Sequence, residues 1–192
     1  MDDADLAAHL AVDLDGWFET LVRCHVDRCH AIALRLLGDA HDAEEIAQDA
    51  LVRAYRALAT YEASRIRELR LRGWLATIVA NLARNRLRRH RPTVVPLAPL
   101  VEIGADPPAG ERTDPESVTT RRAEQRRLAA AVLALPERYR VPVVLRHVDD
   151  LSYDELASVL DRPVGTVKAQ VHRGLALLRR SLTADEHQEL SA

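Results

Sequence analysis

Apolar residues recur every three to four positions along most of this chain, and no segment alternates apolar and polar residues as a half-buried strand would. The predicted helices cover residues 17–37, 42–58, 73–89, 121–135 and 153–160, and two more begin at Pro136 and after Pro163. Residues 1–14 are acidic and weakly patterned, which predicts a frayed N-terminal arm. The pattern therefore predicts an all-α protein.

In each predicted helix the apolar residues line one face, which we expect to form the core. These faces carry Phe18, Val22, His25, Cys29, Ile32 and Leu36, then Ala43, Ile46, Ala50, Ala54 and Leu58, then Trp74, Leu75, Ile78 and Leu82, and finally Ala123, Leu128, Val132 and Leu135. Gly38 is a typical helix stop, and Asp42 with Glu45 resembles a capping box in which Asp42 is the cap.

The segment from Leu151 to Arg180 predicts two helices joined by a tight turn. Ser152 and Glu155 form a capping-box pattern, and Asp161 to Pro163 interrupts the helical period. The second helix has an apolar stripe of Val167, Val171, Leu175 and Leu178, and an opposite face of Thr166, Lys168, Ala169, Gln170, His172 and Arg173. This arrangement is typical of a helix-turn-helix whose second helix enters a DNA major groove. The alternative is an ordinary helical hairpin with a solvated basic face.

Charge is strongly segregated, although the formal net charge is only −2. Residues 1–62 carry −8, residues 63–93 carry +8, residues 94–118 carry −4 and residues 119–192 carry +2. Such asymmetry indicates a nucleic-acid-binding face next to surfaces with other partners.

Two predicted helices carry contrasting polar faces. The helix over 42–58 exposes Glu44, Glu45, Gln48, Asp49 and Arg53, which either form a solvated surface or dock a basic protein partner. The connector over 60–72 is basic, and the helix after it has a second stripe; together they carry Arg65, Arg67, Arg70, Arg72, Asn81, Arg84, Asn85 and Arg88. Asparagine and arginine can hold phosphates and read base edges, so this surface suits single-stranded or distorted DNA. The alternative is a solvated polar face.

Prolines and glycines between Pro92 and Pro115 exclude regular structure there, which predicts an acidic, extended linker over 94–118. A chain of that length reaches roughly 80 Å at about 3.3 Å per residue. The linker could therefore hold two DNA-reading modules more than one duplex turn apart.

Nothing in the sequence predicts a cofactor, a metal site or catalysis. Cys24 and Cys29 lack a CxxC partner, and neither a Gly-rich phosphate loop nor a nucleophile–base arrangement is present. There is no signal peptide and no apolar run near 18 residues, so we expect a soluble, cytoplasmic protein without membrane insertion.

Three stretches in this order resemble bacterial sigma factors of the extracytoplasmic-function (ECF) group. DAEEIAQDALVRAYRAL (Asp42–Leu58) is similar to the family's polymerase-binding helix, and RGWLATIVANLARNRLRRHRP (Arg72–Pro92) to its −10 element helix. LPERYRVPVVLRHVDDLSYDELASVLDRPVGTVKAQVHRGLALLRR (Leu135–Arg180) is similar to the domain that reads the −35 element.

The resemblance implies two small helical domains joined by an extended linker. A sigma region 2-like domain of three or four helices would span 15–93, and a sigma region 4-like helix-turn-helix domain would span 119–183. The arm over 1–14, the linker over 94–118 and a C-terminal tail over 184–192 complete the chain.

The resemblance also implies a non-enzymatic subunit that binds core RNA polymerase (β′ and β subunits), promoter DNA and an anti-sigma factor. Polymerase contact would fall to Glu45, Gln48, Asp49 and Tyr55. The −10 element would meet Arg65, Arg67, Arg70, Arg72, Asn81, Arg84, Asn85 and Arg88, with a flipped base received near the loop. The −35 element would meet Thr166, Lys168, Ala169, Gln170, His172 and Arg173. The alternative function is a stand-alone helix-turn-helix regulator that binds duplex DNA as a dimer.

Overall fold

The structure, a computed structural model, describes residues 1–89, 115–148 and 150–189. In these ranges it consists of helices and turns, which confirms the all-α prediction. The helices are α1 (Asp3–Leu10), α2 (Leu14–Leu37), α3 (Ala40–Leu58), α4 (Ala63–Arg67), α5 (Leu71–Arg89), α6 (Pro115–Ala134), α7 (Glu137–His147), α8 (Tyr153–Leu160) and α9 (Val164–Glu189).

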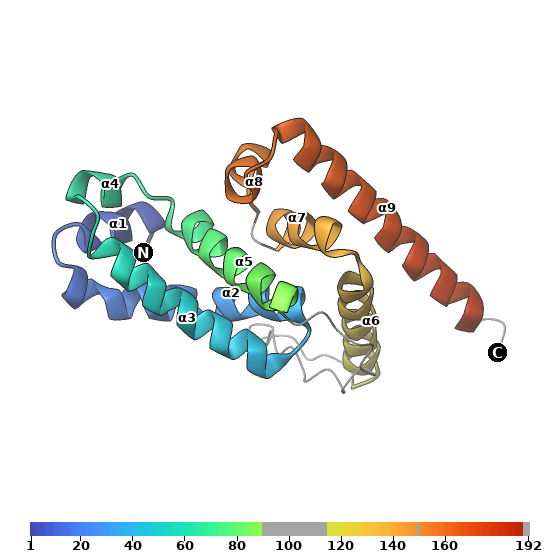
Figure 1. Cartoon of the computed structure of the whole chain (residues 1–192). Coiled ribbons are helices and arrows are strands. Elements are labelled where there is room, and N and C mark those ends of the chain that lie inside the picture. Colours follow the sequence, from blue (N-terminus) through green and yellow to red (C-terminus); the bar gives the residue numbers. More distant parts are fainter. Residues whose placement is uncertain (90–114, 149, 190–192) are drawn as a thin grey trace.

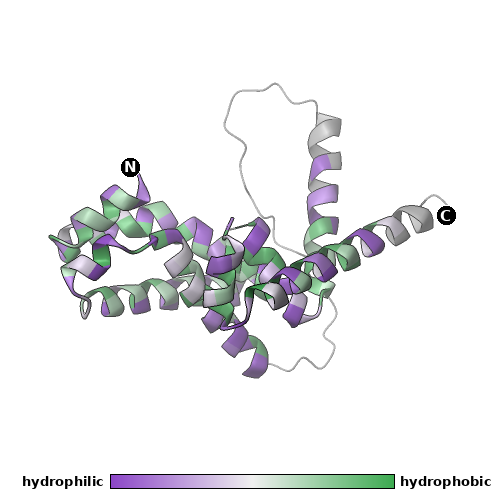
Figure 2. Ribbon diagram, turned by 90° about the horizontal axis from the view of Figure 1, so that it is seen from above, coloured by the Kyte–Doolittle hydropathy of each residue, from purple (hydrophilic) through white to green (hydrophobic). Residues whose placement is uncertain are grey.

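Helices α2, α3 and α5 pack side by side as the N-terminal half, with α1 and α4 at one end of the bundle (Figure 1). The predicted inward alanines of α3 are all buried, which lets the neighbouring backbones approach closely. Hydrophilic and hydrophobic residues alternate around the helices, as expected when each helix buries one face (Figure 2).

The prediction of a frayed arm over 1–14 was wrong. Leu6, Ala7 and Leu10 are fully buried where α1 packs on α2, α4 and α5. The carboxylate of Asp3 accepts a hydrogen bond from the backbone N–H of Arg72, at 3.1 Å, in the first turn of α5. That turn has unpaired N–H groups, and an acceptor supplied by another helix serves one of them. A short helix stabilised by such distant contacts leaves little local pattern in the sequence.

The start of α3 also differs from the prediction. Asp39 is the cap, and its Oδ1 accepts a hydrogen bond from the backbone N–H of Asp42 at 2.8 Å. Asp42 instead accepts a hydrogen bond from Arg86 on α5 at 2.6 Å. The predicted stop at Gly38 is confirmed by its left-handed φ of 79°.

The C-terminal half consists of α6 to α9, with α8 and α9 forming the predicted helix-turn-helix (Figure 1). The capping box of α8 is confirmed in both directions, and Asp161 turns the chain with a φ of 50°. Most of the predicted linker lies outside the described residues. Residues 115–118 belong to α6, so the predicted C-terminal boundary of the linker, at 118, was wrong. The predicted tail was also misplaced, because α9 continues to Glu189.

Two predicted core positions of α6 are wrong. Ala123 is exposed. Leu128 is 48% exposed, because burial on this helix begins only at Ala131. From there Ala131 and Leu135 pack with Val143 of α7 and Leu178 of α9. Leu128 shares their apolar face but lies beyond the part of it that α7 and α9 cover.

The two halves share one apolar core in this free chain. A single cluster runs from Leu36 and Leu75 of the N-terminal bundle to Val144 of α7 and Val171 of α9. Leu133 of α6 packs at Gly38, where an added Cβ would lie 2.8 Å from its Cδ1. The two halves of the free chain are therefore packed together and are not separate modules.

His25 is the one buried polar residue of the core among the described residues. Its Nε2 atom makes no hydrogen bond and lies 3.6 Å from Oδ1 of Asp3. Burial lowers the pKa of His25 below 6.5, the nearby Asp3 carboxylate partly opposes this, and Arg72 and Arg28 lower it further. The folded state consequently favours the neutral imidazole.

A pH dependence of stability follows from that preference. Between the lowered pKa and 6.5 the unfolded chain binds a proton at His25 that the folded chain does not. The free energy of unfolding should therefore fall as the pH drops below 6.5, by at most about 1.4 kcal/mol per pH unit from this group. His25→Leu should lose that part of the slope in urea unfolding at pH 7.5 and 5.5. Equal slopes for both proteins would contradict the assignment.

Candidate nucleic-acid interface

The second stripe of α5 lies largely on the surface. Asn81, Asn85 and Arg88 are exposed, as the sequence predicted, whereas Arg84 is half-buried. The guanidinium of Arg84 lies 3.8 Å from the carboxylate of Glu137 on α7. Three of the four side chains can therefore meet a nucleic acid directly, and the fourth already faces a carboxylate.

Beside this stripe is a hollow of about 270 Å³ between α3 and α5. It is lined by Arg53, Ala57, Tyr61, Trp74, Ile78, Asn81, Leu82 and Asn85. Two carboxamides and a guanidinium therefore stand at an apolar surface that includes two aromatic rings. Carboxamides pair with base edges, and aromatic faces stack on bases, so the hollow has the chemistry to hold an unstacked base.

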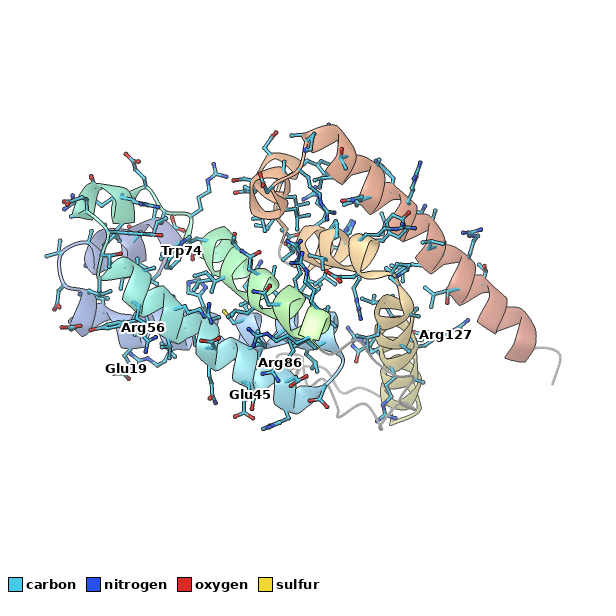
Figure 3. All side chains as sticks on the ribbon, viewed as in Figure 1. Glu19, Glu45, Arg56, Trp74, Arg86 and Arg127 are labelled. Carbon is cyan, nitrogen blue, oxygen red and sulfur yellow. The ribbon has the colours of Figure 1, made fainter. Side chains whose placement is uncertain are left out.

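The aromatic side of the hollow is in contact with α4 through Arg65. The Tyr61 and Trp74 rings lie 6.2 Å apart between centroids, and the guanidinium of Arg65 lies 3.8 Å above the Tyr61 ring. Trp74 is labelled near the start of α5 in Figure 3. The sequence predicted Trp74 in the core and Arg53 on the exposed face of α3, and it gave Tyr61 no role. Their convergence depends on the packing of α3 against α5, which no local pattern reveals.

The basic connector is partly helical, since it contains α4. Arg65, Arg67, Arg70 and Arg72 are all exposed, while Ile66 is buried and anchors the segment. Nη1 of Arg70 lies 2.7 Å from Oε1 of Glu155 on α8. The hydrogen bond from the backbone N–H of Ser152 holds the pKa of Glu155 below its usual value, and the contact with Arg70 lowers it further.

We call the exposed side of α3 with Glu44, Glu45, Gln48 and Asp49 the acidic face. Its side chains are paired within the chain: Gln48 donates to Glu44 at 3.3 Å, and Asp49 accepts from Arg53 at 3.0 Å. Glu45 accepts from Arg86 of α5, which points toward it in Figure 3, and this hydrogen bond lowers the pKa of Glu45.

Two apolar side chains interrupt the polar surface of α3. Val52 is 48% exposed and Tyr55 is 37% exposed, both large values for such residues. The Tyr55 hydroxyl donates to Asp15 at 2.6 Å, and this hydrogen bond raises the pKa of Tyr55. Acidic and apolar groups side by side suit a protein partner better than the phosphate backbone of DNA.

The first turns of α9 present the predicted recognition residues. Thr166, Lys168, Ala169, His172 and Arg173 are exposed. Gln170 is half-buried, and its Oε1 accepts a hydrogen bond from Arg162 at 3.0 Å. This face carries side chains that can contact base edges and phosphates in a major groove.

Other kinds of site have no support in the described ranges. No group of three or more His, Cys, Asp or Glu side chains within them could hold a metal ion. Cys24 is exposed and Cys29 is buried, and neither forms a disulfide. None of the helices described is both long and apolar enough to cross a membrane.

Comparison with known proteins identifies both halves. The profile of Sigma-70 region 2 matches residues 21–93, and that of Sigma-70 region 4 matches residues 125–178. The chain is 32% identical over 174 residues to the ECF RNA polymerase sigma factor SigW of Bacillus subtilis (strain 168), covering 86% of this chain and 88% of SigW.

Two solved structures share the fold. CnrH in complex with the cytosolic domain of CnrY aligns with a TM-score of 0.66 at 27% identity, covering 95% of this chain and 98% of CnrH. The sigma factor RpoE from Bartonella quintana, in complex with the anti-sigma factor NepR, aligns with a TM-score of 0.62 at 22% identity, covering 88% and 98%. Matches over both halves do not favour a stand-alone helix-turn-helix regulator. The chain belongs to the RNA polymerase sigma factors of the ECF group.

Proposed function

We propose that this sigma factor divides its work among three surfaces on three helices. The acidic face of α3 binds core RNA polymerase, the α5 surface holds the −10 element, and the first turns of α9 read the −35 element. The observation that carries the proposal is the hollow beside α5, where Asn81 and Asn85 stand next to Tyr61 and Trp74. A polar stripe alone would also suit a solvated helix, whereas a hollow with aromatic walls suits a base.

At the −10 element, one base of the non-template strand leaves the stack and enters the hollow. The carboxamides pair with its edge, and an aromatic ring supports its face. Arg65 and Arg67 of the connector and Arg88 of the α5 stripe are exposed, and their guanidinium groups neutralise the phosphates of the displaced strand. The energy of these contacts offsets the cost of unpairing and unstacking, about a few kcal/mol per base.

At the −35 element, α9 lies in the major groove. Lys168, His172 and Arg173 supply the donors, and Ala169 offers a methyl group that suits a thymine methyl. The amide N–H₂ group of Gln170 can donate to a base while its Oε1 accepts from Arg162. Base preference at this element therefore depends on side chains that include a neutral amide as well as cations.

Polymerase docks on α3 through the acidic face and the exposed apolar patch formed by Val52 and Tyr55. Apolar groups supply buried area, and the carboxylates orient a basic surface of the β′ and β subunits. We further propose that a protein inhibitor, an anti-sigma factor, also binds this chain. The related CnrH, which was solved in complex with a second protein, supports this part.

In vitro transcription with core RNA polymerase tests the proposed function. Genomic DNA of the source organism should yield a defined set of start sites that require this chain, and those promoters should share two upstream elements. Core polymerase without the chain provides the control. Start sites that do not change on adding the chain would contradict the proposal.

Arg173→Ala should weaken discrimination at the −35 element. A bidentate arginine contact with a base contributes about 1–3 kcal/mol of discrimination, so roughly 5- to 150-fold should be lost at one position. Competition binding of the polymerase complex to wild-type and singly substituted −35 sequences measures this. An unchanged ranking of the sequences would remove Arg173 from the base-reading residues.

A further inference from the structure

Arg86 of α5 contacts α3 and does not line the hollow. Its Nη1 atom donates a hydrogen bond to Oδ1 of Asp42 at 2.6 Å, and its Nη2 atom donates one to Oε2 of Glu45. Arg86 and Glu45 are labelled in Figure 3, where they point toward each other from the two helices. The side chains of Arg86 and Asp42 are each only 27% exposed. A planar guanidinium that two carboxylates hold at once has a fixed position and orientation.

Glu45 is the residue of the acidic face that this guanidinium holds. The hydrogen bond from Arg86 is the main reason why the pKa of Glu45 is low, and His41, whose Nε2 lies 3.4 Å from Oε1, lowers it further. The carboxylate is therefore ionised and has a contact at each oxygen. Its side chain is still 47% exposed, and each oxygen has a second lone pair that a partner can use.

The other hydrogen bonds described above for the acidic face lie within α3 itself. Gln48 donates to Glu44, and Asp49 accepts from Arg53, each four residues apart. The side chains of Asp49 and Arg53 are 44% and 56% exposed, so solvent competes with their pairing. Glu45 differs because a residue of another helix restricts it before any partner binds.

Both charge and geometry favour docking through Glu45. Arg86 contributes one positive charge, and Asp42 and Glu45 contribute two negative charges, so the cluster keeps a net charge of −1 toward a basic partner. A side chain that is fixed before binding loses little further conformational entropy when a complex forms. Such preorganisation lengthens the lifetime of the complex.

We infer that Arg86 is a positioning residue for polymerase docking, although it belongs to the helix proposed to hold the −10 element. It acts through Glu45, which it holds in the orientation that core RNA polymerase meets. The inference rests on the proposed function of the acidic face.

Four variants and one control separate this role from a purely structural one. Arg86→Gln removes the guanidinium, Glu45→Gln removes the charge that it holds, and a third protein combines both changes. Arg86→Lys keeps the positive charge but cannot bind two carboxylates through one planar group, and it carries the test should Arg86→Gln not fold. Arg89→Gln is the matched control, because it removes the same charge from an exposed position of α5.

The measurement is the association and dissociation rate of each protein with labelled core polymerase, without DNA, together with its stability in urea. We expect Arg86→Gln to dissociate about three- to tenfold faster than wild type, which corresponds to ordering one side chain on binding. Association should not slow, because loss of a cation leaves the cluster more negative. Arg86→Lys should lie between Arg86→Gln and wild type. Arg89→Gln should stay within about twofold of wild type, and adding Arg86→Gln to Glu45→Gln should change the rates less than about twofold.

Three results would overturn the positioning role: Arg86→Gln dissociating no faster than Arg89→Gln, its effect multiplying that of Glu45→Gln, or reduced stability with unchanged dissociation. In each of these cases Glu45→Gln would still weaken binding if the acidic face docks polymerase. Unchanged rates for both Glu45→Gln and Asp49→Arg would instead show that the acidic face is not the docking surface, and the proposed function of α3 would fail.

Discussion

Replacing Asn81 and Asn85 together with alanine should abolish most promoter opening by the polymerase complex. Each carboxamide that pairs with a base edge contributes about 1–3 kcal/mol, so the two together account for at least roughly 30-fold in affinity for the −10 strand. Both side chains are exposed at the rim of the hollow, and their removal creates no buried cavity. Permanganate footprinting of the melted region and binding of the non-template strand measure the loss.

The control for this variant is Gln125→Ala, which removes an exposed amide from α6. Binding of the N81A/N85A protein to core polymerase should not change, because the acidic face lies on α3. If promoter opening by the double variant stays within threefold of wild type, the hollow does not hold a base. If polymerase binding falls as well, the defect lies in folding and the assignment loses its support.

Reversing the charge of Asp49 should reduce the affinity of the chain for core polymerase by on the order of tenfold or more. Asp49 lies within the acidic face, and Asp49→Arg places a cation where a basic partner surface is expected to dock. Within the chain the change costs only the exposed pair with Arg53, which contributes about 0.3–0.5 kcal/mol. A binding titration with labelled core polymerase measures the effect.

Asp27→Arg serves as the matched control, because it makes the same change of charge at an exposed position of α2. Binding of duplex DNA by the α8–α9 surface should be equal in all three proteins. The interface would have to be sought elsewhere if Asp49→Arg and Asp27→Arg weakened polymerase binding equally. A parallel loss of duplex binding would indicate global misfolding.

The helices and most of their buried faces could be predicted from the sequence because both depend on local spacing. Ile46 and Leu58 of α3 are buried as the 3.6-residue period requires, and the Ser152–Glu155 capping box forms as its motif predicts. Exposure of Asn81, Asn85 and Arg88 followed from the same period. These features are set within a few residues of one another, so a single sequence contains them.

The remaining features depend on contacts between distant segments. Asp42 resembled a helix cap, yet Asp39 caps α3 and Asp42 pairs with Arg86, 44 residues away. The α1 helix lacks a strong pattern of its own and is held by the packing of Leu6 and by Asp3. The hollow likewise forms only when α3 and α5 meet. Spacing along one helix carries no information about which surface of another helix will lie opposite.

The shared core of the two halves changes how the linker is understood. The 25-residue acidic, proline-rich segment predicted a linker long enough to hold two DNA-reading modules more than one duplex turn apart. In the free chain, Leu151 and Val144 instead belong to the same apolar cluster as the N-terminal bundle. The linker length then matters for the polymerase-bound state, in which the halves must reach two separate promoter elements.

Site-specific photocrosslinking of one promoter complex tests the central claim most directly. A photoreactive side chain placed at Arg88 of α5 or at Arg173 of α9 occupies an exposed position in either case. With core polymerase present, the position 88 probe should label the non-template strand at the −10 element, and the position 173 probe the duplex at the −35 element. Labelling of a single element by both probes, or an identical pattern without polymerase, would contradict the account.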